Sequence, residues 1–438
     1  MGRALQVKSE YLPQVKRSLP QHGYWNQRML AEDAGFAQAT VCNFLNGKPV
    51  DIRTLIELCH RLDLDVNEIA EPPPTDPPPE IEDQETEPPL EPDLPSPGKV
   101  ILEFPTGLVR LDSPFYIARS SQEKQCYDEI EQVGALIRIK APRQFGKTSL
   151  LVRVLDQAKQ AGHRMVYLSL QEVDSAHLTD SATFLAWFYG AIASELELFE
   201  HINAYEKFAQ SLGSKRACIL CFEKYIFPNL SEPLTLGLDE LDRILEASSV
   251  SADFFALLRV MNEKSKLGGI WQNFRLVLVH AIHAIEGMVP MDVNQSPFNV
   301  GLPIELTEFT SEQIQELAHR HDLNWQKTEV EQLRQFVGGM PFLVRLMLYH
   351  LATQKQSLAQ VLQNEFAAIT VYREYLERLE RTIAHLDLDK TMRTIATSNA
   401  DLSQVPLRSR YELHSLGLIK GIDDLRPRCE LYRRYFCR

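Results

Sequence analysis

The stretch ALIRIKAPRQFGKTSLL, residues 135–151, runs from an apolar segment through a glycine-containing loop into a helical pattern. A phosphate-binding loop has the pattern G-x-x-x-x-G-K-[ST], in which backbone amides and a helix N-terminus hold phosphate. Gly146, Lys147 and Thr148 fit the second half of this pattern, and Ala141 stands at the position of the first glycine. The stretch predicts an α/β P-loop core with a buried parallel sheet.

A second motif, PLTLGLDELDRI at 233–244, supplies the acids that such a loop requires. A site that hydrolyses nucleotide needs a carboxylate for Mg²⁺ and an acid that polarises water. The apolar run from Leu234 to Leu238 predicts a buried strand, because parallel strands covered on both faces are apolar throughout. Asp239 at its end is the candidate metal ligand, and Glu240 is the candidate base.

Two further segments predict strands of the same sheet: RMVYLSLQ at 164–171 and FRLVLVH at 274–280. His280 ends the second of these and is expected to face the terminal phosphate, with His283 nearby. A purely structural role for both histidines is an equal alternative.

The loop itself supplies most of the candidate binding residues. Lys147 is expected to reach the terminal phosphates, so it joins Glu240 as a candidate catalytic residue, and Thr148 is expected to bind Mg²⁺ with Asp239. The other loop residues expected at the nucleotide are Ala141, Arg143, Gln144, Phe145, Gly146 and Ser149. Arg143 either touches phosphate or is only solvated. Arg243, Arg259 and Arg345 are candidates for an arginine finger or a lid sensor, with a role as a surface or salt-bridge arginine as the alternative.

The net charge of −13 comes mostly from one segment. Residues 71–98 hold nine acids, no base and eleven of the 25 prolines, whereas residues 1–70 hold eight acids and eight bases. A stretch of this composition has little to bury and predicts an extended, disordered linker. A docking site for a proline-binding module is the alternative interpretation.

Several classes of protein are not expected. No run of 18 apolar residues predicts a membrane span, and the N-terminus MGRALQVKSEYLPQ lacks the apolar core of a signal peptide, so we expect a cytoplasmic protein without membrane contact. Seven scattered cysteines do not make a disulfide framework. Cys218 and Cys221 stand alone as a C-x-x-C pair and are expected to be buried thiols rather than part of a metal site.

The sequence pattern of residues 1–70 predicts consecutive short helices. Ala31, Gly35, Val41, Phe44 and Gly47 have the spacing of a helix-turn-helix, in which small residues allow the helices to approach and apolar ones hold the second helix to the core. With the following DIRTLIELCHRL, this segment resembles the lambda-repressor-like helix-turn-helix family over roughly 26–69.

The resemblance implies a recognition helix from about Gln38 to Leu45. Gln38, Thr40 and Asn43 would face the major groove, and Gln27 would lie near a phosphate; amide side chains suit adenine edges. Since phosphate contacts by Lys and Arg supply most DNA affinity, this neutral module is expected to bind weakly. DNA contact through residues 26–46 and a role as a protein adapter both stay open.

The segments LDSPFYIARSSQEKQCYDEI, ALIRIKAPRQFGKTSLL, LGLDELDRI, NQSPFNVGLPIEL and SRYELHSLGLIKGIDDLRPRCELYRRYF resemble a bacterial AAA-like, STAND-related P-loop ATPase family over roughly 105–438. The resemblance implies ATP and Mg²⁺ as cofactors and a loop that begins with Ala. It implies that Tyr116, Ile117 and Arg119 lie over the base, and that the turn ending in Pro341 contacts phosphate. Some family members carry N-terminal effector modules and are linked to signalling or conflict systems built around MoxR ATPases and von Willebrand A proteins.

These observations predict a multidomain chain. We expect an all-α helix-turn-helix domain at 1–70, the linker at 71–98, a P-loop ATPase core at 99–310, a helical lid at 311–385 and a winged-helix domain at 386–438. The expected function is a slowly hydrolysing, ATP-binding switch that presents the N-terminal module to DNA or to a protein partner of a signalling or conflict system, with nucleotide-dependent homo-oligomers as one outcome. The alternatives are a DNA-binding regulator with a static nucleotide-holding core, and a pure protein adapter.

Overall fold

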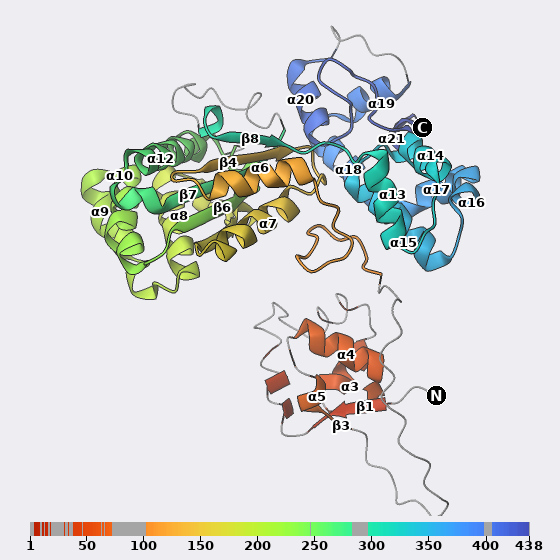
Figure 1. Ribbon diagram of the computed structural model, residues 1–438, viewed down its shortest axis with the longest axis horizontal. Coiled ribbons are helices and arrows are strands. Elements are labelled where there is room, and N and C mark those ends of the chain that lie inside the picture. The colour runs from red at the N-terminus through yellow and green to blue at the C-terminus, as the bar shows by residue number, and fades with distance from the viewer. Residues whose placement is uncertain are drawn as a thin grey trace, which may run out of the picture. The chain divides into compact units, whose positions relative to one another are not determined.

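The computed structural model divides the chain into two compact units, Met1–Ser96 and Pro97–Arg438 (Figure 1). The structure describes residues 4–8, 11–12, 14–15, 18, 30, 34, 38–45, 47–62, 64, 66–71, 102–245, 247–282, 297–397 and 405–437. The expected linker at 71–98 lies outside these residues, except for Glu71. Within the described residues, no helix has the length and apolar character that a bilayer crossing requires.

The N-terminal unit combines short helices with a small antiparallel sheet. Strand β1 (Ala4–Val7) lies between β2 (Val50–Asp51) and β3 (Ala70–Glu71). Helices α3 (Gln38–Leu45), α4 (Ile52–Arg61) and α5 (Val66–Ile69) complete the described elements. The expectation of an all-α domain is therefore wrong. Strands of two to four residues leave no periodic pattern in the sequence, because their pairing depends on segments far apart in the chain.

The larger unit is built on a parallel sheet with the strand order β5-β6-β7-β4-β8. The strands are β4 (Leu136–Ala141), β5 (Arg164–Ser169), β6 (Leu234–Asp239), β7 (Phe274–Ala281) and β8 (Leu302–Glu305). The expected α/β core with a parallel sheet is confirmed, and so are the strands expected near 135–140, 164–171, 234–238 and 274–280. The edge strand β8 was not predicted, because its four residues, LPIE, are too few and too mixed in polarity to form an apolar run.

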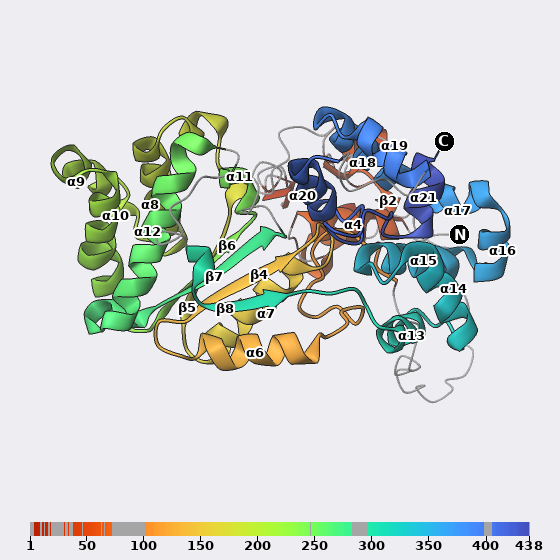
Figure 2. The ribbon, with the colours of Figure 1, turned by 90° about the horizontal axis from the view of Figure 1, so that it is seen from above.

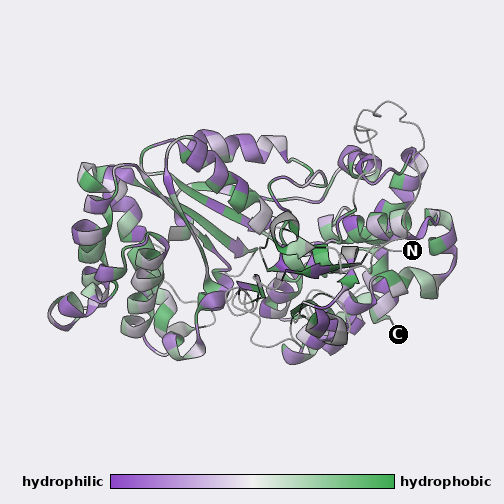
Figure 3. Cartoon of the chain, turned by 90° about the horizontal axis from the view of Figure 1, so that it is seen from below, coloured by the Kyte–Doolittle hydropathy of each residue, from purple (hydrophilic) through white to green (hydrophobic). Residues whose placement is uncertain are grey.

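Successive residues of a strand point to opposite faces of a sheet, and β7 shows this directly. Val277 and Val279 pack with α7 (Lys147–Gln160) and α6 (Ser120–Ile130), whereas Leu276 and Leu278 pack with α8 (Ser181–Glu195) and α12 (Ser248–Leu267). Figure 2 shows these two helix layers on either side of the strands. In Figure 3 the strands are largely hydrophobic, as expected for a sheet that helices cover on both faces.

Helices α9 (Ala204–Leu212) and α10 (Ser214–Cys221) extend the layer on the α8 side. Cys218 and Cys221 lie buried in this layer as free thiols, which confirms the expectation for this pair. Burial raises the pKa of Cys221 to about 12, so this thiol stays protonated and unreactive at neutral pH.

The chain after β8 is helical. Its first group of helices is α13 (Ser311–Arg320), α14 (Lys327–Val337), α15 (Pro341–Gln354), α16 (Leu358–Gln363), α17 (Glu365–Val371) and α18 (Arg373–His385). The last group is α19 (Asp389–Thr397), α20 (Leu407–Ser415) and α21 (Glu430–Phe436), with one antiparallel bridge between Ile419 and Pro427. Thr310 begins the first group with a capping box, and Pro341 suits the first turn of α15, where its missing N–H costs nothing.

Gly237 in β6 allows α7 to lie close to the sheet. A Cβ atom at this position would be 2.9 Å from Leu155 Cδ1 and 3.0 Å from Leu151 Cδ1. Gly237→Ala is therefore expected to lower the free energy of unfolding by about 1–3 kcal/mol through overpacking. Urea unfolding followed by circular dichroism measures this change.

Gly107→Ala is the matched control, because no atom lies within 4 Å of the added Cβ. Equal unfolding midpoints for the two variants would contradict the proposed role of Gly237 in helix packing.

Candidate nucleotide-binding site

A cleft of about 1200 Å³ opens at the carboxyl end of the sheet. Its core side contains the loop between β4 and α7, together with the residues that follow β5 and β6. Its helical side contains residues of α15, α17 and α18. Ligands of open parallel sheets bind at this end, because loops and helix N-termini converge there.

The glycine-containing loop has the backbone geometry that its sequence predicts. Gly146 has φ +87° and immediately precedes α7, and Gln144 is also left-handed with φ +64°. Two left-handed residues in one short loop produce a tight turn, and its amides adjoin the N-terminus of a helix of 14 residues. Such an arrangement favours an anion at the helix N-terminus.

Lys147 is the first residue of α7 and lines the cleft. Its Nζ atom donates to Ala141 O at 3.1 Å and to Pro142 O at 3.0 Å. Burial lowers the pKa of Lys147, and the carboxylates of Asp242 and Asp239 act against this shift. An anionic ligand in the cleft would stabilise the charged ammonium further.

Asp239 and Thr148, the two expected metal ligands, both line the cleft, and the Thr148 hydroxyl is near enough to Asp239 to act on the pKa of its carboxyl. The hydroxyl of Tyr167 donates to Asp239 Oδ2 at 3.3 Å, and the amide of Glu240 donates to Oδ1 at 2.9 Å. Burial raises the pKa of Asp239. A hydroxyl and a desolvated carboxylate are oxygen ligands of the kind that Mg²⁺ prefers, so the residues present fit this ion.

Glu240 follows Asp239 in a left-handed conformation, with φ +56°. Non-glycine residues in this region are strained and concentrate at functional sites. Burial raises the pKa of Glu240, and the nearby charges of Asp239 and Asp242 add to the increase. A carboxylate with a raised pKa is better matched to accepting a proton near neutral pH.

Two polar residues that line the cleft were not predicted from the sequence. Asp242 accepts hydrogen bonds from the amide of Ala281 at 2.8 and 3.1 Å and so joins the turn after β6 to the end of β7. Gln171 follows β5, lines the cleft and acts to lower the pKa of Glu240 against the effect of burial. Both are polar residues at or just after the carboxyl end of a predicted strand, and this signal could have identified them.

Tyr116 and Ile117, which were expected over the base, line the cleft. The hydroxyl of Tyr116 donates to Glu123 Oε1 at 2.7 Å, and the guanidinium carbon of Arg153 lies 3.3 Å from the centre of the Tyr116 ring. Arg119 also lines the cleft, but its Nη2 atom donates to Phe145 O at 2.8 Å. Arg119 therefore holds the loop in position.

The lid turn brings Pro341 to the cleft. The amide of Gly339 donates to Glu308 Oε2 at 3.2 Å, and the carbonyl of Gly339 accepts from Phe309 N at 2.7 Å. A Cβ atom at Gly339 would lie 2.4 Å from Phe309 O, so only glycine fits this turn.

Two of the three candidate arginines line the cleft, and the third does not. Arg243 and Arg345 line the cleft, where Arg243 Nη2 donates to Val173 O at 3.1 Å and Arg345 Nη2 to Glu103 Oε2 at 3.0 Å. Arg259 does not line the cleft and forms an ion pair with Glu263 on its own helix. Arg259 therefore takes the salt-bridge role that was one of its alternatives.

Arg143, Gln144, Gly146, Thr148 and Ser149 all line the cleft. Ala141 and Phe145 are buried behind it instead, where the guanidinium of Arg428 lies 5.4 Å from the centre of the Phe145 ring. The backbone amide of Arg143 donates to Ser415 O at 2.9 Å, so the C-terminal helices also hold the loop.

The structure does not bring His280 to the cleft. Its ring packs against Phe298 with 5.1 Å between ring centres, and its Nδ1 atom contacts Ala281 O at 2.8 Å. Burial lowers the pKa of His280 to about 4. Along β7 this position alternates with Val279, so its side chain points to the face opposite α7. His283 lies outside the described residues.

The candidate DNA-contacting residues belong to the N-terminal unit. Gln38, Thr40 and Asn43 lie on α3, whose bounds agree with the expected recognition helix, and Thr40 and Asn43 are half-buried. Gln27 lies outside the described residues.

The raised pKa of Glu240 predicts a pH-dependent cost in stability. Since the folded chain binds this proton more tightly than the unfolded chain, stability falls as pH rises from about 4.3, the ordinary glutamate pKa, through the raised folded value. Glu240→Gln should therefore unfold at a higher urea concentration than the natural chain at pH 8, and the gain should shrink toward pH 4. An equal difference at both pH values would contradict this origin.

Comparisons with known proteins agree with this geometry. The sequence profile of a family described as "AAA-like domain" matches residues 104–438. The Walker-type ATPase PABY2304 of Pyrococcus abyssi is similar in structure, with a TM-score of 0.50 and 14% identity over 73% of this chain and 96% of that one. The Aeropyrum pernix ORC2 protein, solved in ADPNP and ADP complexes, has a TM-score of 0.43 and 14% identity over 74% of this chain and 85% of that one.

At this identity the similarity to the Walker-type ATPase shows the fold alone. A search of curated proteins returned no match. The family match covers more than half of the chain and the whole of the cleft described above, and the chain therefore belongs to the AAA-like domain family.

Proposed function

We propose that this protein is an ATP-binding switch that hydrolyses its nucleotide slowly. One observation carries the proposal: the phosphate loop, the Thr148–Asp239 pair and Glu240 meet in a single cleft whose other wall is helical. A ligand that fills this cleft touches both walls. Its binding would therefore change how they pack, as the nucleotide of a switch must do.

Thr148 and Asp239 would hold Mg²⁺ together with the phosphates. Among the described residues, no group of three or more His, Cys, Asp or Glu side chains is arranged to hold a metal alone. This suits Mg²⁺, which proteins commonly bind through one or two carboxylates plus substrate phosphates. When bound, Mg²⁺ neutralises charge that develops on the phosphates.

The chain's own residues divide the remaining work. Lys147 and the loop amides would orient the terminal phosphates, and Glu240 would accept a proton from the attacking water. Arg243 and Arg345 each donate from Nη2 to an acceptor of the chain, Val173 O and Glu103, and keep other N–H groups for a ligand. Slow turnover would follow if these contacts have to break before either guanidinium reaches the transferred phosphoryl group.

The C-terminal residues 386–438 would sense the state of the cleft as a winged-helix domain of the STAND type. The hydrogen bond from the Arg143 amide to Ser415 O supports this role, because a shift of the loop would move α20 directly. The N-terminal unit would be the output, a helix-turn-helix that reads DNA or binds a protein partner through α3. Assembly of several copies in the presence of ATP would be one form of that output.

A static core is the second candidate. The observation that favours it is that Lys147 already donates to two carbonyls of its own loop. A regulator of this kind would bind DNA through the N-terminal unit with an affinity that ignores nucleotide and survives Lys147→Ala.

Lys147→Ala is expected to weaken the binding of labelled ATP in the presence of Mg²⁺ by at least about tenfold, because a charged group that contacts phosphate is removed. Equilibrium dialysis of the full chain measures this. Lys159→Ala is the matched control, since Lys159 lies exposed at the far end of the same helix. Absence of binding by the natural chain would sink the proposal.

Glu240→Gln should retain ATP binding and reduce turnover by about 10²–10⁴-fold, the usual contribution of a general base. Phosphate release under single-turnover conditions separates this effect from nucleotide exchange. Equal rates for the variant and the natural chain would assign the base to another residue or support the static core.

A further inference from the structure

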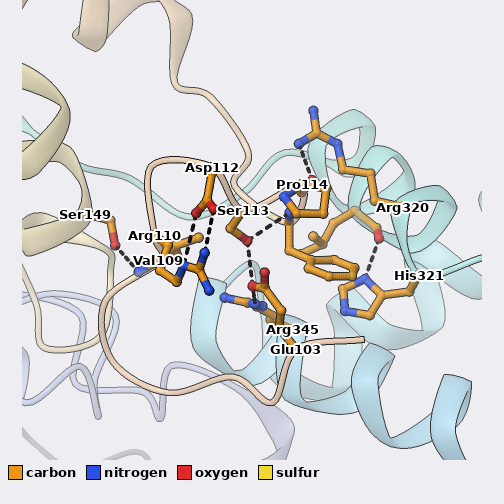
Figure 4. A network of polar contacts seen from close by, with 12 residues as sticks. Glu103, Val109, Arg110, Asp112, Ser113, Pro114, Ser149, Arg320, His321 and Arg345 are labelled. Atoms are coloured by element: carbon orange, nitrogen blue, oxygen red, sulfur yellow. Dashed lines mark hydrogen bonds and ion pairs between the residues drawn. The ribbon is translucent and has the colours of Figure 1, made fainter. Parts of the chain in front are cut away.

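Residues 103–113, here called the strap, reach both walls of the cleft. On the lid side, Glu103 Oε2 accepts from Arg345 Nη2 at 3.0 Å, and the Phe104 ring lies edge-on to Tyr349 with 5.3 Å between ring centres. Arg345 and Tyr349 both belong to α15. Figure 4 shows Glu103 between Arg345 and the returning end of the strap.

On the core side, the strap is held by the helix that follows the phosphate loop. The amide of Val109 donates to Ser149 Oγ at 3.0 Å. Arg153, one turn further along α7, donates from Nη1 to Val109 O at 3.0 Å and from Nη2 to Arg110 O at 2.8 Å. The planar guanidinium fork therefore holds two successive carbonyls of the strap.

The strap is also closed on itself. The hydroxyl of Ser113 donates to Glu103 Oε2 at 2.6 Å, so the two ends lie together (Figure 4). Between them, the five residues Phe104, Pro105, Thr106, Gly107 and Val109 line the cleft. The tip from Thr106 to Leu108 is exposed, and segments with few buried contacts open locally at low cost in free energy.

The attachment of the strap to α15 is more buried than the exposed tip. The side chain of Arg345 is 8% exposed in its pair with Glu103, and its guanidinium carbon lies 5.4 Å from the centre of the Phe115 ring. Release of Glu103 would leave a buried cation without its partner, which is costly. The strap thus combines a loose tip with strong anchors, so it has to break specific contacts before it moves away from the cleft.

From this geometry we propose that the strap is the gate through which nucleotide enters and leaves, an inference that rests on the proposed function. Glu103 and Arg153 are the positioning residues that keep it shut. Neither of them lines the cleft, so each acts on the ligand through the residues it holds: the strap in both cases, with Arg345 for Glu103 and Tyr116 for Arg153. Opening breaks the Glu103–Arg345 pair on one wall and the contacts of Val109 and Arg110 on the other.

A gate has a kinetic signature. Loss of an anchor speeds entry and exit together and leaves the dissociation constant nearly unchanged, whereas loss of a direct ligand contact speeds exit alone. Stopped-flow mixing of the full chain with a fluorescent ATP analogue and Mg²⁺ gives the association rate constant. A chase of the loaded protein with unlabelled ATP gives the dissociation rate constant.

Glu103→Ala is expected to raise both rate constants about tenfold, the change that loss of one hydrogen bond to a charged group produces. Glu103→Gln keeps an acceptor for Ser113 and Arg345 and should give an intermediate increase. Arg153→Lys loses the planar fork whose two nitrogens reach Val109 O and Arg110 O, and it should act in the same direction. Asp112→Ala is the matched control, because Asp112 pairs with Arg110 on the exposed side of the strap.

Unchanged rates in both anchor variants, or faster exit without faster entry, would overturn the gate. Absence of analogue binding by the natural chain would sink the proposed function and the gate with it, so the two failures are distinguishable. If a variant folds poorly, hydrogen exchange of the peptide that contains Val109 still tests the proposal. Its exchange should accelerate in both anchor variants while peptides of the sheet keep their protection, and equal protection of the strap in all variants would contradict the proposal.

Discussion

The close packing of α7 on β6 is the constraint on which the cleft depends. Gly237 has no side chain, so Leu151 and Leu155 of α7 lie directly against the strand. The first turn of that helix carries Lys147 and Thr148, and Asp239 lies two residues beyond the glycine on the strand. The distance between helix and strand therefore determines whether hydroxyl and carboxylate can meet. The relative position of the polar groups at the site therefore depends on close packing in the hydrophobic core.

A second set of contacts joins the loop to parts of the chain far away in sequence. Arg428 stacks on Phe145 and donates from Nη1 to Glu308 Oε1 at 3.0 Å, and the other oxygen of Glu308 accepts from the amide of Gly339. One carboxylate thus connects the glycine turn before α15 with the C-terminal residues. Movement of either element would change the hydrogen bonds of the other, as the proposed switch requires.

The sequence predicted the parts of this structure that local chemistry determines. The apolar run that becomes β6 and the acids after it lie where buried parallel strands place them, and the loop residues from Arg143 to Ser149 are brought to the cleft apart from Phe145. Features that depend on packing between distant segments could not be predicted from the sequence. His280 turns to the other face of the sheet, β1 pairs with segments dozens of residues away, and the strap follows no periodic pattern because its contacts come from two distant helices.

The hydrogen bond between the Arg143 amide and Ser415 O has a consequence for how the protein is made. Ser415 and Arg428 lie close to the end of the chain, and ribosomes extend a chain by only about 5–20 residues per second. The phosphate loop is therefore synthesised long before two of the residues that hold it in place. Until Ser415 and Arg428 have left the ribosome, the loop would be held by earlier contacts alone, such as the one from Arg119 to Phe145 O.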